Sequence, residues 1–349
     1  MNIQEIAQRA GVSRSTVSYV LSGKRQVTEV TRRRVMSVID EAGYRPSAMA
    51  RALAHGETRT LGLVIPPLHH HLSSEQLQFV GAVAEAAADR DYDILLSPSG
   101  GDREDAFDRL VGERKVDGIL LMETRWHDRR ARMLTETGFP FVTIGRTGAE
   151  REHAWVDLDY SGLVAECMRQ LHALGHRHIA FINRPQEMLD QEYGPALRSV
   201  EAFENAKARL GVDGSARCCE DSASGAYRVI DDILGAEPAV TAVVTINEQA
   251  LGGVMEALQR HGRRVPQDVS VMAIASARVA TQVQPPVTAA DVPAEQMSQQ
   301  AVDALLRRIG DPGTALEHLL LSPSFLDRGS VGPANPWTER PTDRSGHRT

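Results

Sequence analysis

The sequence has few residues that could build a disulfide framework or a metal cluster. Its three cysteines are Cys167, Cys218 and Cys219, and their spacing matches neither kind of site. We therefore expect ordinary thiols in a reducing compartment, without metal or cofactor. No apolar run reaches the ~18 residues needed to cross a bilayer, and the opening MNIQEIAQRAGVS lacks the apolar core of a signal peptide. These absences favour a cytoplasmic protein over a membrane protein.

Common catalytic motifs are also missing. The chain contains no G-x-G-x-x-G after a strand-like run, no P-loop and no G-x-S-x-G. An enzyme built on a nucleotide-binding core is therefore disfavoured, and we expect no enzymatic activity. A secreted solute-binding protein is a further alternative, which the missing signal peptide argues against.

The charges are unevenly distributed along the chain. The whole sequence of 349 residues has a net charge of −7, with 39 basic and 46 acidic residues. Residues 1–60 hold 10 basic and 5 acidic residues, a net of +5, which leaves −12 for the remainder. A small basic segment joined to a large acidic body suggests an anionic partner for that segment, although a merely solvated basic face would have the same charge.

Three short helices are predicted in the first 42 residues. Apolar residues recur at helical spacing, as Ile3, Ile6, Ala7 and Ala10, then Val17, Val20 and Leu21, then Val35, Val38, Ile39 and Ala42. Gly11 permits a tight turn after the first helix, and Ser13 suits the N-cap of the second, expected at 14–21. The third should begin near Thr28 or Thr31. This arrangement is typical of a helix-turn-helix.

The rest of the chain is predicted to form two α/β lobes. Runs such as LGLVI, DGILLM, FVTIG, HIAFI, TAVVTI and VSVMAI alternate with helical stretches. Continuous apolar runs are typical of parallel strands buried on both faces, and the alternation indicates βαβ units. Their number suits two doubly wound parallel sheets, with a change near residue 158. Residues 333–349 are polar, Pro-rich and aperiodic, so we expect disorder there.

The segment IQEIAQRAGVSRSTVSYVLSGKRQVTEVTRRRVMSVIDEAGYRPSAMARAL resembles the DNA-binding head and hinge of the lactose-repressor/galactose-repressor (LacI/GalR) family. TRTLGLVIP, ERKVDGILLM, FPFVTIGR, LGHRHIAFI, NEQALGGVMEAL, VPQDVSVMAI and PPVTAADVP resemble its periplasmic-binding-protein-like core, in the family's order. The resemblance implies a dimeric transcription regulator that binds DNA through its head. It also implies that the core binds a small molecule between the lobes. It divides the chain into a head (1–45), a hinge (46–58), a first lobe (59–158 and 291–318) and a second lobe (159–290 and 319–332).

The resemblance also indicates residues that contact a palindromic operator. In the head these are Arg14, Ser15 and Tyr19 at base-reading positions, with Thr16 and Ser18 on phosphates. Arginine is commoner where Tyr19 stands, so Tyr19 could read a different base, or lie along the backbone and read none. The hinge candidates are Ser47, Arg51 and Leu53. Leu53 matches a leucine that is wedged into the minor groove; the alternative is a plain linker with Leu53 packed on the core.

The effector candidates lie where strand ends converge between the lobes. By resemblance they are His70, Arg146, Asp159, Arg198, Asn247 and Ser276. Asp159 could equally be structural, and His70 lies in a run of three histidines that is better suited to exposure or hydrogen bonding than to metal. Two family anchors are altered, since Ala275 and Ser276 follow the strand where an Asp is usual, and Arg198 is displaced by one position. A sugar is the expected effector, with a non-sugar metabolite as the alternative.

Overall fold

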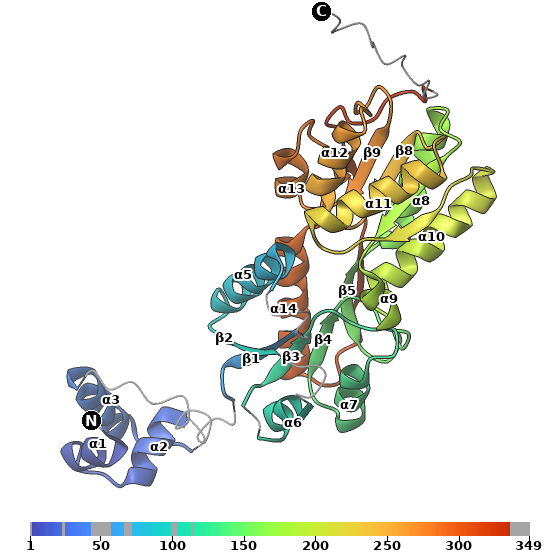
Figure 1. Cartoon of the computed structure of the whole chain (residues 1–349). Coiled ribbons are helices and arrows are strands. Elements are labelled where there is room, and N and C mark those ends of the chain that lie inside the picture. Colours follow the sequence, from blue (N-terminus) through green and yellow to red (C-terminus); the bar gives the residue numbers. More distant parts are fainter. Residues whose placement is uncertain are drawn as a thin grey trace, which may run out of the picture.

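A computed structural model describes residues 2–22, 25–42, 57–65, 72–98, 104–113 and 115–335 of the chain. Within these ranges a three-helix head precedes two α/β lobes, each built on a six-stranded sheet (Figure 1). The predicted fold class is thereby confirmed. Most of the predicted hinge, and the predicted tail from residue 336 onward, lie outside the described residues.

The head consists of α1 (Ile3–Arg9), α2 (Arg14–Ser22) and α3 (Glu29–Glu41). Asn2 caps α1, and Thr28 caps α3 through its side chain. Gly11 adopts a φ of 61°, the left-handed conformation that glycine tolerates best, and so allows the turn between α1 and α2. The three helices enclose one small apolar core, formed by Ile6, Ala7, Ala10, Val17, Val20, Val35, Val38 and Ile39.

The sheet of the first lobe has the strand order β11-β5-β4-β3-β1-β2, and all its strands are parallel. The strands are β1 (Thr60–Ile65), β2 (Asp93–Pro98), β3 (Gly118–Leu121), β4 (Phe141–Ile144), β5 (Ala154–Leu158) and β11 (His318–Leu321). The helices of this lobe are α5 (Ser74–Ala88), α6 (Glu104–Gly112), α7 (Arg129–Thr137) and α14 (Ala294–Gly310). A Cβ on Gly118 would come within 2.8 Å of Leu305, so the missing side chain lets α14 lie close against β3.

The second sheet has the order β12-β10-β9-β8-β6-β7, and only β12 runs antiparallel. Its strands are β6 (Ile179–Asn183), β7 (Ala216–Cys218), β8 (Ala242–Thr245), β9 (Ser270–Ile274), β10 (Thr288–Ala290) and β12 (Phe325–Leu326). Its helices are α8 (Tyr160–Ala173), α9 (Gln186–Asp190), α10 (Gly194–Leu210), α11 (Ala223–Ala236), α12 (Leu251–Arg260) and α13 (Ala277–Gln282). Figure 1 shows α11 and α12 together on one side of this sheet and α8 and α10 on the other.

The chain crosses between the lobes three times, after β5, after β10 and after β11. The third crossing comes later than the expected boundary at residue 318, because β11 continues in the first sheet to Leu321. The expected disorder from residue 333 also begins too early, since the Ala334 amide donates to the Leu174 carbonyl over 2.9 Å. No helix in the described part of the chain is long and apolar enough to span a membrane.

Candidate functional site

The candidate DNA-reading residues lie on the outer face of α2. Val17 and Val20 fill the head core, which fixes the rotation of the helix. Arg14 and Ser15 are therefore exposed, while Ser18 and Tyr19 are half-buried along the same helix. Arg25 lies over the Tyr19 ring, with its guanidinium carbon 5.8 Å from the ring centre. This face carries donors and an aromatic ring at positions free to meet another molecule.

Hydroxyl groups organise the first turn of α2. The Thr16 amide donates to Ser13 Oγ over 3.1 Å, so Ser13 caps the helix as predicted. Ser13 Oγ also lies 2.8 Å from Ser15 Oγ and 2.8 Å from Thr16 Oγ1. Ser13 and Thr16 thus stabilise the first turn of α2. Arg14 forms no such capping contact among the described hydrogen bonds. Ser47, Arg51 and Leu53 of the predicted hinge lie outside the described residues.

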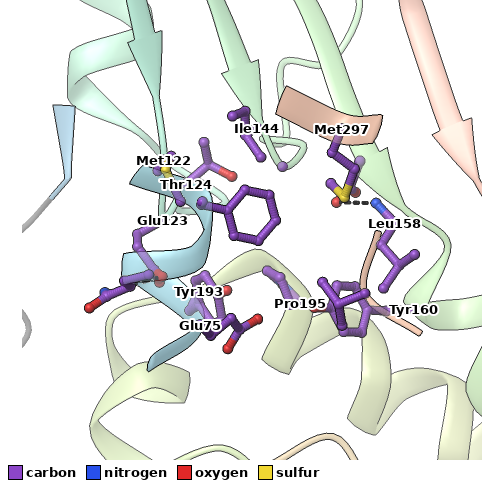
Figure 2. A pocket seen from close by; sticks show the side chains of 15 residues that line it. Glu75, Met122, Glu123, Thr124, Ile144, Leu158, Tyr160, Tyr193, Pro195 and Met297 are labelled. Carbon is purple, nitrogen blue, oxygen red and sulfur yellow. Dashed lines mark hydrogen bonds between the residues drawn. The ribbon is translucent and has the colours of Figure 1, made fainter. Parts of the chain in front are cut away.

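A small cavity of about 40 Å³ lies where the two lobes meet. Its first-lobe wall includes Met122, Thr124 and Ile144, and its second-lobe wall includes Tyr193 and Pro195, which Figure 2 shows on the opposite side. Small-molecule sites usually enclose about 300–1,000 Å³. In this conformation the lobes are therefore closed around a space too small for a sugar.

Two predicted effector residues, Arg146 and Arg198, do not line this cavity but hold a buried carboxylate that does, that of Asp157. Arg146 Nε and Arg198 Nη2 each lie 2.9 Å from Oδ2 of Asp157, whose side chain is 2% exposed. Arg198 also donates to the Arg146 carbonyl over 3.2 Å. Burial raises the pKa of Asp157, and the two guanidinium groups oppose that rise. Since Asp157 lies on β5 and Arg198 on α10, this ion pair joins the lobes.

Asn247 and Asp159 serve the backbone in this structure. The Asn247 amide, fully buried, donates to the Cys219 carbonyl over 2.8 Å and accepts from the Ala250 amide over 3.2 Å. Asp159 caps α8 by accepting from the Gly162 amide over 3.0 Å, the structural alternative foreseen for it. Neither Asn247 nor Asp159 lines the described cavity. Their polar atoms are occupied because strand-to-helix loops leave backbone groups to satisfy.

The remaining predicted effector residues have different outcomes. Ser276 is 2% exposed and follows β9 of the second lobe, where its amide donates to Glu248 Oε2 over 2.8 Å. His70 and its neighbouring histidines lie outside the described residues. No group of three or more potential metal-binding side chains occurs among the residues that are described.

Sequence reasoning missed four charged residues at the junction of the lobes. Arg184 follows β6 and forms an ion pair with Glu75 of α5, and their side chains are only 5% and 14% exposed. Glu123 follows β3, and Gln76 donates to its Oε1 over 3.3 Å. Glu248 follows β8. The positions of Glu123, Arg184 and Glu248 after strand ends were a usable signal, but such positions are numerous in a doubly wound sheet.

A second hollow, of about 470 Å³, lies on the first lobe between α7 and the 147–153 loop. Trp126 lines it with 41% of its surface exposed, and His153 lies in its wall. Burial lowers the pKa of His153 to about 4, so this imidazole is neutral at neutral pH. The hollow is large enough for a small molecule, but sequence analysis did not single it out.

These observations define a class of protein, namely a helix-turn-helix head joined to a two-lobed, periplasmic-binding-protein-like core. Residues 2–47 match the family model of bacterial regulatory proteins, lacI family, and residues 168–331 match a periplasmic binding protein-like domain. The chain belongs to the LacI family of transcription regulators. Membership of this family confirms the expectation of a DNA-binding regulator that is not an enzyme.

Relatives and solved structures support this assignment over nearly the whole chain. The regulator AglR of Rhizobium meliloti is 30% identical, with 96% of this chain and 95% of that protein covered. The ribose operon repressor of Escherichia coli is also 30% identical, with 94% and 99% covered. The structure of a CelR-cellobiose complex is 28% identical, with a TM-score of 0.70 and coverage of 95% and 99%. The structure of the operator-bound lac repressor dimer matches with a TM-score of 0.81 at 22% identity, and the match covers 95% of this chain and 99% of that chain. This match supports the fold alone.

Proposed function

We propose that this protein is a homodimeric repressor that binds a palindromic operator and responds to a sugar bound between its lobes. The single observation that carries the DNA-binding part is the exposed face of α2, where Arg14 is displayed by a helix whose other side is locked into the head core. Arg14 offers two donors suited to guanine O6 and N7 in the major groove. Such a regulator acts on cytoplasmic, nucleoid DNA.

The head, the hinge and the two lobes are those expected from the resemblance, with the first lobe extended to Leu321. Ser15 and Tyr19 read bases beside Arg14, whereas Thr16 and Ser18 position the helix on phosphates. Ser47, Arg51 and Leu53 contribute hinge contacts to the operator centre, with Leu53 as a minor-groove wedge. Together these assignments describe how the head and the hinge would contact the operator.

An exposed apolar edge of the first lobe supports the dimer. Leu77 on α5 is 55% exposed and Leu96 on the edge strand β2 is 43% exposed. Both elements lie at the same end of the first sheet, at its β2 edge (Figure 1). Burial against a second copy removes these apolar groups from water. Two-fold symmetry then matches a palindromic DNA site.

A sugar effector is supported by the regulators to which the chain is similar, which include a CelR-cellobiose complex and ribose operon repressors. The interlobe cavity is the proposed place for it, since both lobes line that cavity. A ligand that binds one arrangement of the lobes better shifts their equilibrium and, through the hinge, the affinity for DNA. A non-sugar metabolite is the second candidate, favoured by the occupation of Asn247 in backbone contacts.

The test is selection of binding sites from random duplex DNA by the purified protein, followed by titration of the selected site with sugars. We expect an inverted repeat and a sugar that changes its affinity. An enriched single half-site would contradict the dimer. Thermal unfolding tests the sensor separately, because a ligand at about 100 times its Kd stabilises the folded state by roughly 2.7 kcal/mol.

A further inference from the structure

The hollow between α7 and the 147–153 loop, which we call the α7 hollow, has no part in the proposed function. One wall is a single face of α7, because its residues stand at positions 128, 131, 132 and 135, and the loop forms another wall. Three small residues in these walls, Ala131, Gly148 and Ala149, leave room between them. The resulting space of about 470 Å³ falls within the range of about 300–1,000 Å³ that is typical of small-molecule sites.

Trp126 contributes an indole ring to the lining of the α7 hollow. The residue is 41% exposed, whereas tryptophan is highly buried on average. Its ring lies close to Gly148, because a Cβ on that glycine would come within 2.9 Å of the indole Nε1 and 3.0 Å of Cε2. The Gly148 amide also donates to the Trp126 carbonyl over 2.8 Å. The indole is therefore held in place before any ligand arrives.

The charges in the lining of the α7 hollow balance at neutral pH. Arg132 and Glu152 are exposed, and their side chains form no ion pair within the described part of the chain. The Asp128 carboxylate is paired with Arg130 at 2.7 Å. Burial lowers the pKa of His153 to about 4, so its imidazole adds no charge. One free cation and one free anion together favour an uncharged ligand over an ion.

The polar groups of the lining suit the edge of a flat heterocycle. Arg132 offers donors and Glu152 offers acceptors. Nε2 of His153 is buried in this wall and has no hydrogen-bond partner among the described residues. A heteroaromatic ring carries both acceptor nitrogens and donor groups on its edge, and its face can stack on the Trp126 indole. A puckered sugar ring meets an indole only through the C–H groups of one side.

The segment that carries Trp126 also joins the two lobes. The Trp126 amide donates to the Glu192 carbonyl over 2.7 Å, and His127 Nδ1 lies 2.8 Å from Glu192 Oε2. Arg125 donates to Gln191 Oε1 over 3.0 Å. Gln191 and Glu192 follow α9 of the second lobe. A ligand stacked on Trp126 stabilises this segment where it holds the second lobe, and so favours the present arrangement of the lobes.

We propose that the α7 hollow is a second small-molecule site, which takes an uncharged heteroaromatic compound such as a nucleoside stacked on Trp126, and that its occupation acts on the contact between the lobes. The site goes beyond the proposed function, which places a sugar in the interlobe cavity. Trp126 does not line that cavity. Only the effect on DNA affinity rests on the proposed function.

The first measurement is calorimetric titration of the full-length protein with adenosine, cytidine, ribose and AMP. Ribose lacks the base of adenosine, and AMP adds a charged phosphate to it. We expect at least one of the two nucleosides to bind about tenfold more tightly than ribose or AMP at the α7 hollow, because stacking of a base on an aromatic ring supplies most of the affinity. Ribose bound between the lobes would not depend on Trp126, so variants separate the two sites.

Variants of the indole locate the binding. Trp126→Leu keeps an apolar side chain but removes the ring, and it should weaken nucleoside binding about tenfold or more. Trp126→Phe keeps a stacking face and should stay within about threefold of the unmodified protein. Leu320→Ala is the matched control, because Leu320 is 44% exposed on β11 of the same lobe and lies outside the α7 hollow. Its Kd should stay within about twofold.

A change beside the indole tests its position without removing it. Gly148→Ala leaves every lining side chain in place, but the added Cβ forces the indole to shift. Nucleoside binding should weaken by about fivefold, since stacking depends on the placement of the ring. Thermal unfolding of each variant without ligand shows that it is folded. A purely structural role of Trp126 would lower the unfolding temperature of Trp126→Leu and leave the nucleoside Kd unchanged.

Operator binding tests the link to the lobes. A saturating concentration of the bound nucleoside should change the Kd for the selected operator by at least about fivefold, and the operator should change the nucleoside Kd by the same factor. Trp126→Leu should abolish this effect at the same nucleoside concentration, whereas Leu320→Ala should retain it.

The outcomes separate this inference from the proposed function. The absence of binding by both nucleosides, or binding that Trp126→Leu leaves unchanged, overturns the site. Binding of AMP as tight as that of adenosine, or tighter Trp126-dependent binding of ribose, overturns the ligand class. Trp126-dependent binding that leaves operator affinity unaltered overturns the action on the lobes. If no operator is selected, the proposed function fails, while calorimetry still tests the site.

Discussion

The outer face of α2 and the junction between the lobes contrast in how their polar residues are used. On α2, Arg14 and Ser15 are exposed and stand on a helix held by its opposite side. At the junction, Arg146 and Arg198 are held by a carboxylate, and within the second lobe Asn247 is held by backbone groups. A surface that reads another macromolecule can be displayed by a short local element, whereas a buried site has to satisfy its own polar groups first.

The contrast teaches that a family position and a free ligand-binding group are different things. Arg146 and Asn247 stand where the resemblance places effector contacts, yet each is engaged within the protein. Among the described residues, buried atoms without a hydrogen-bond partner occur both at predicted effector positions, in the Ser276 hydroxyl and Nε of Arg198, and at positions that were not predicted, in Glu123 and Glu248. Substitutions can separate residues that hold the junction together from residues that remain available to a ligand.

The largest effect is expected for Asp157→Ala. It leaves the Arg146 and Arg198 guanidinium groups without their shared carboxylate, and Arg198 is only 8% exposed. Removing one partner of a buried ion pair usually costs about 3–5 kcal/mol. Urea unfolding should show this loss, against a much smaller change for Glu150→Ala, whose contact to Arg146 is 3.5 Å long and partly exposed. Equal losses in the two variants would show that the Asp157 pairs do not stabilise the junction.

The next largest effect is a change in pH dependence for Glu123→Gln. The pKa of Glu123 is about 7 in the folded protein, raised from 4.5 by burial and by the charge of Glu75. A raised carboxyl pKa favours the protonated folded form, so its contribution is complete below pH 4.5 and is lost as the pH rises through 7. The loss is up to about 3 kcal/mol. Urea unfolding between pH 5 and pH 8 should give a flatter profile for the variant; superimposable profiles would show that Glu123 ionises normally.

On the head, Arg14→Ala should relax the preference at one operator base pair by about 1–3 kcal/mol. The measurement is binding to a set of operators that differ at single positions. Arg33→Ala serves as the control, because Arg33 is exposed on α3 and pairs with Glu29 at 3.6 Å. It should weaken binding to all sequences alike. Uniform weakening by Arg14→Ala as well would make Arg14 a phosphate contact and remove the contrast with Arg33.

The smallest effect separates the cap of α2 from its reading face. Ser13→Ala removes the acceptor for the Thr16 amide and should destabilise the head by about 1 kcal/mol. Ser15→Ala should change stability by less than about 0.5 kcal/mol, because Ser15 is exposed. Amide hydrogen exchange in α2 reports both values. Comparable protection in the two variants would argue against Ser13 as the cap.

Sequence reasoning worked best where structure is local or strictly periodic. The spacing of apolar residues placed α1, α2 and α3, because side chains three and four positions apart share one face of a helix. Continuous apolar runs indicated the buried parallel strands for the same kind of reason. Ser13 was recognised as a cap because its acceptor serves an amide only three residues away.

Sequence reasoning was weakest at the junction of the lobes. Glu75, Glu123, Arg184 and Glu248 are separated by up to 173 positions, and no local pattern distinguishes them from other charged residues at helix starts and strand ends. The end of β11 at Leu321 was also missed, because a strand at the edge of a sheet is only partly buried and its apolar signal is weak.

The sequence by itself therefore determined the family, the three-helix head and the two α/β lobes, since these depend on contiguous motifs and on periodic burial. The tertiary structure decided which polar side chains between the lobes are already satisfied and which remain without a partner. The physical reason is that a hydrogen bond or ion pair depends on where distant chain segments meet, and a few ångströms separate a paired charge from an unpaired one.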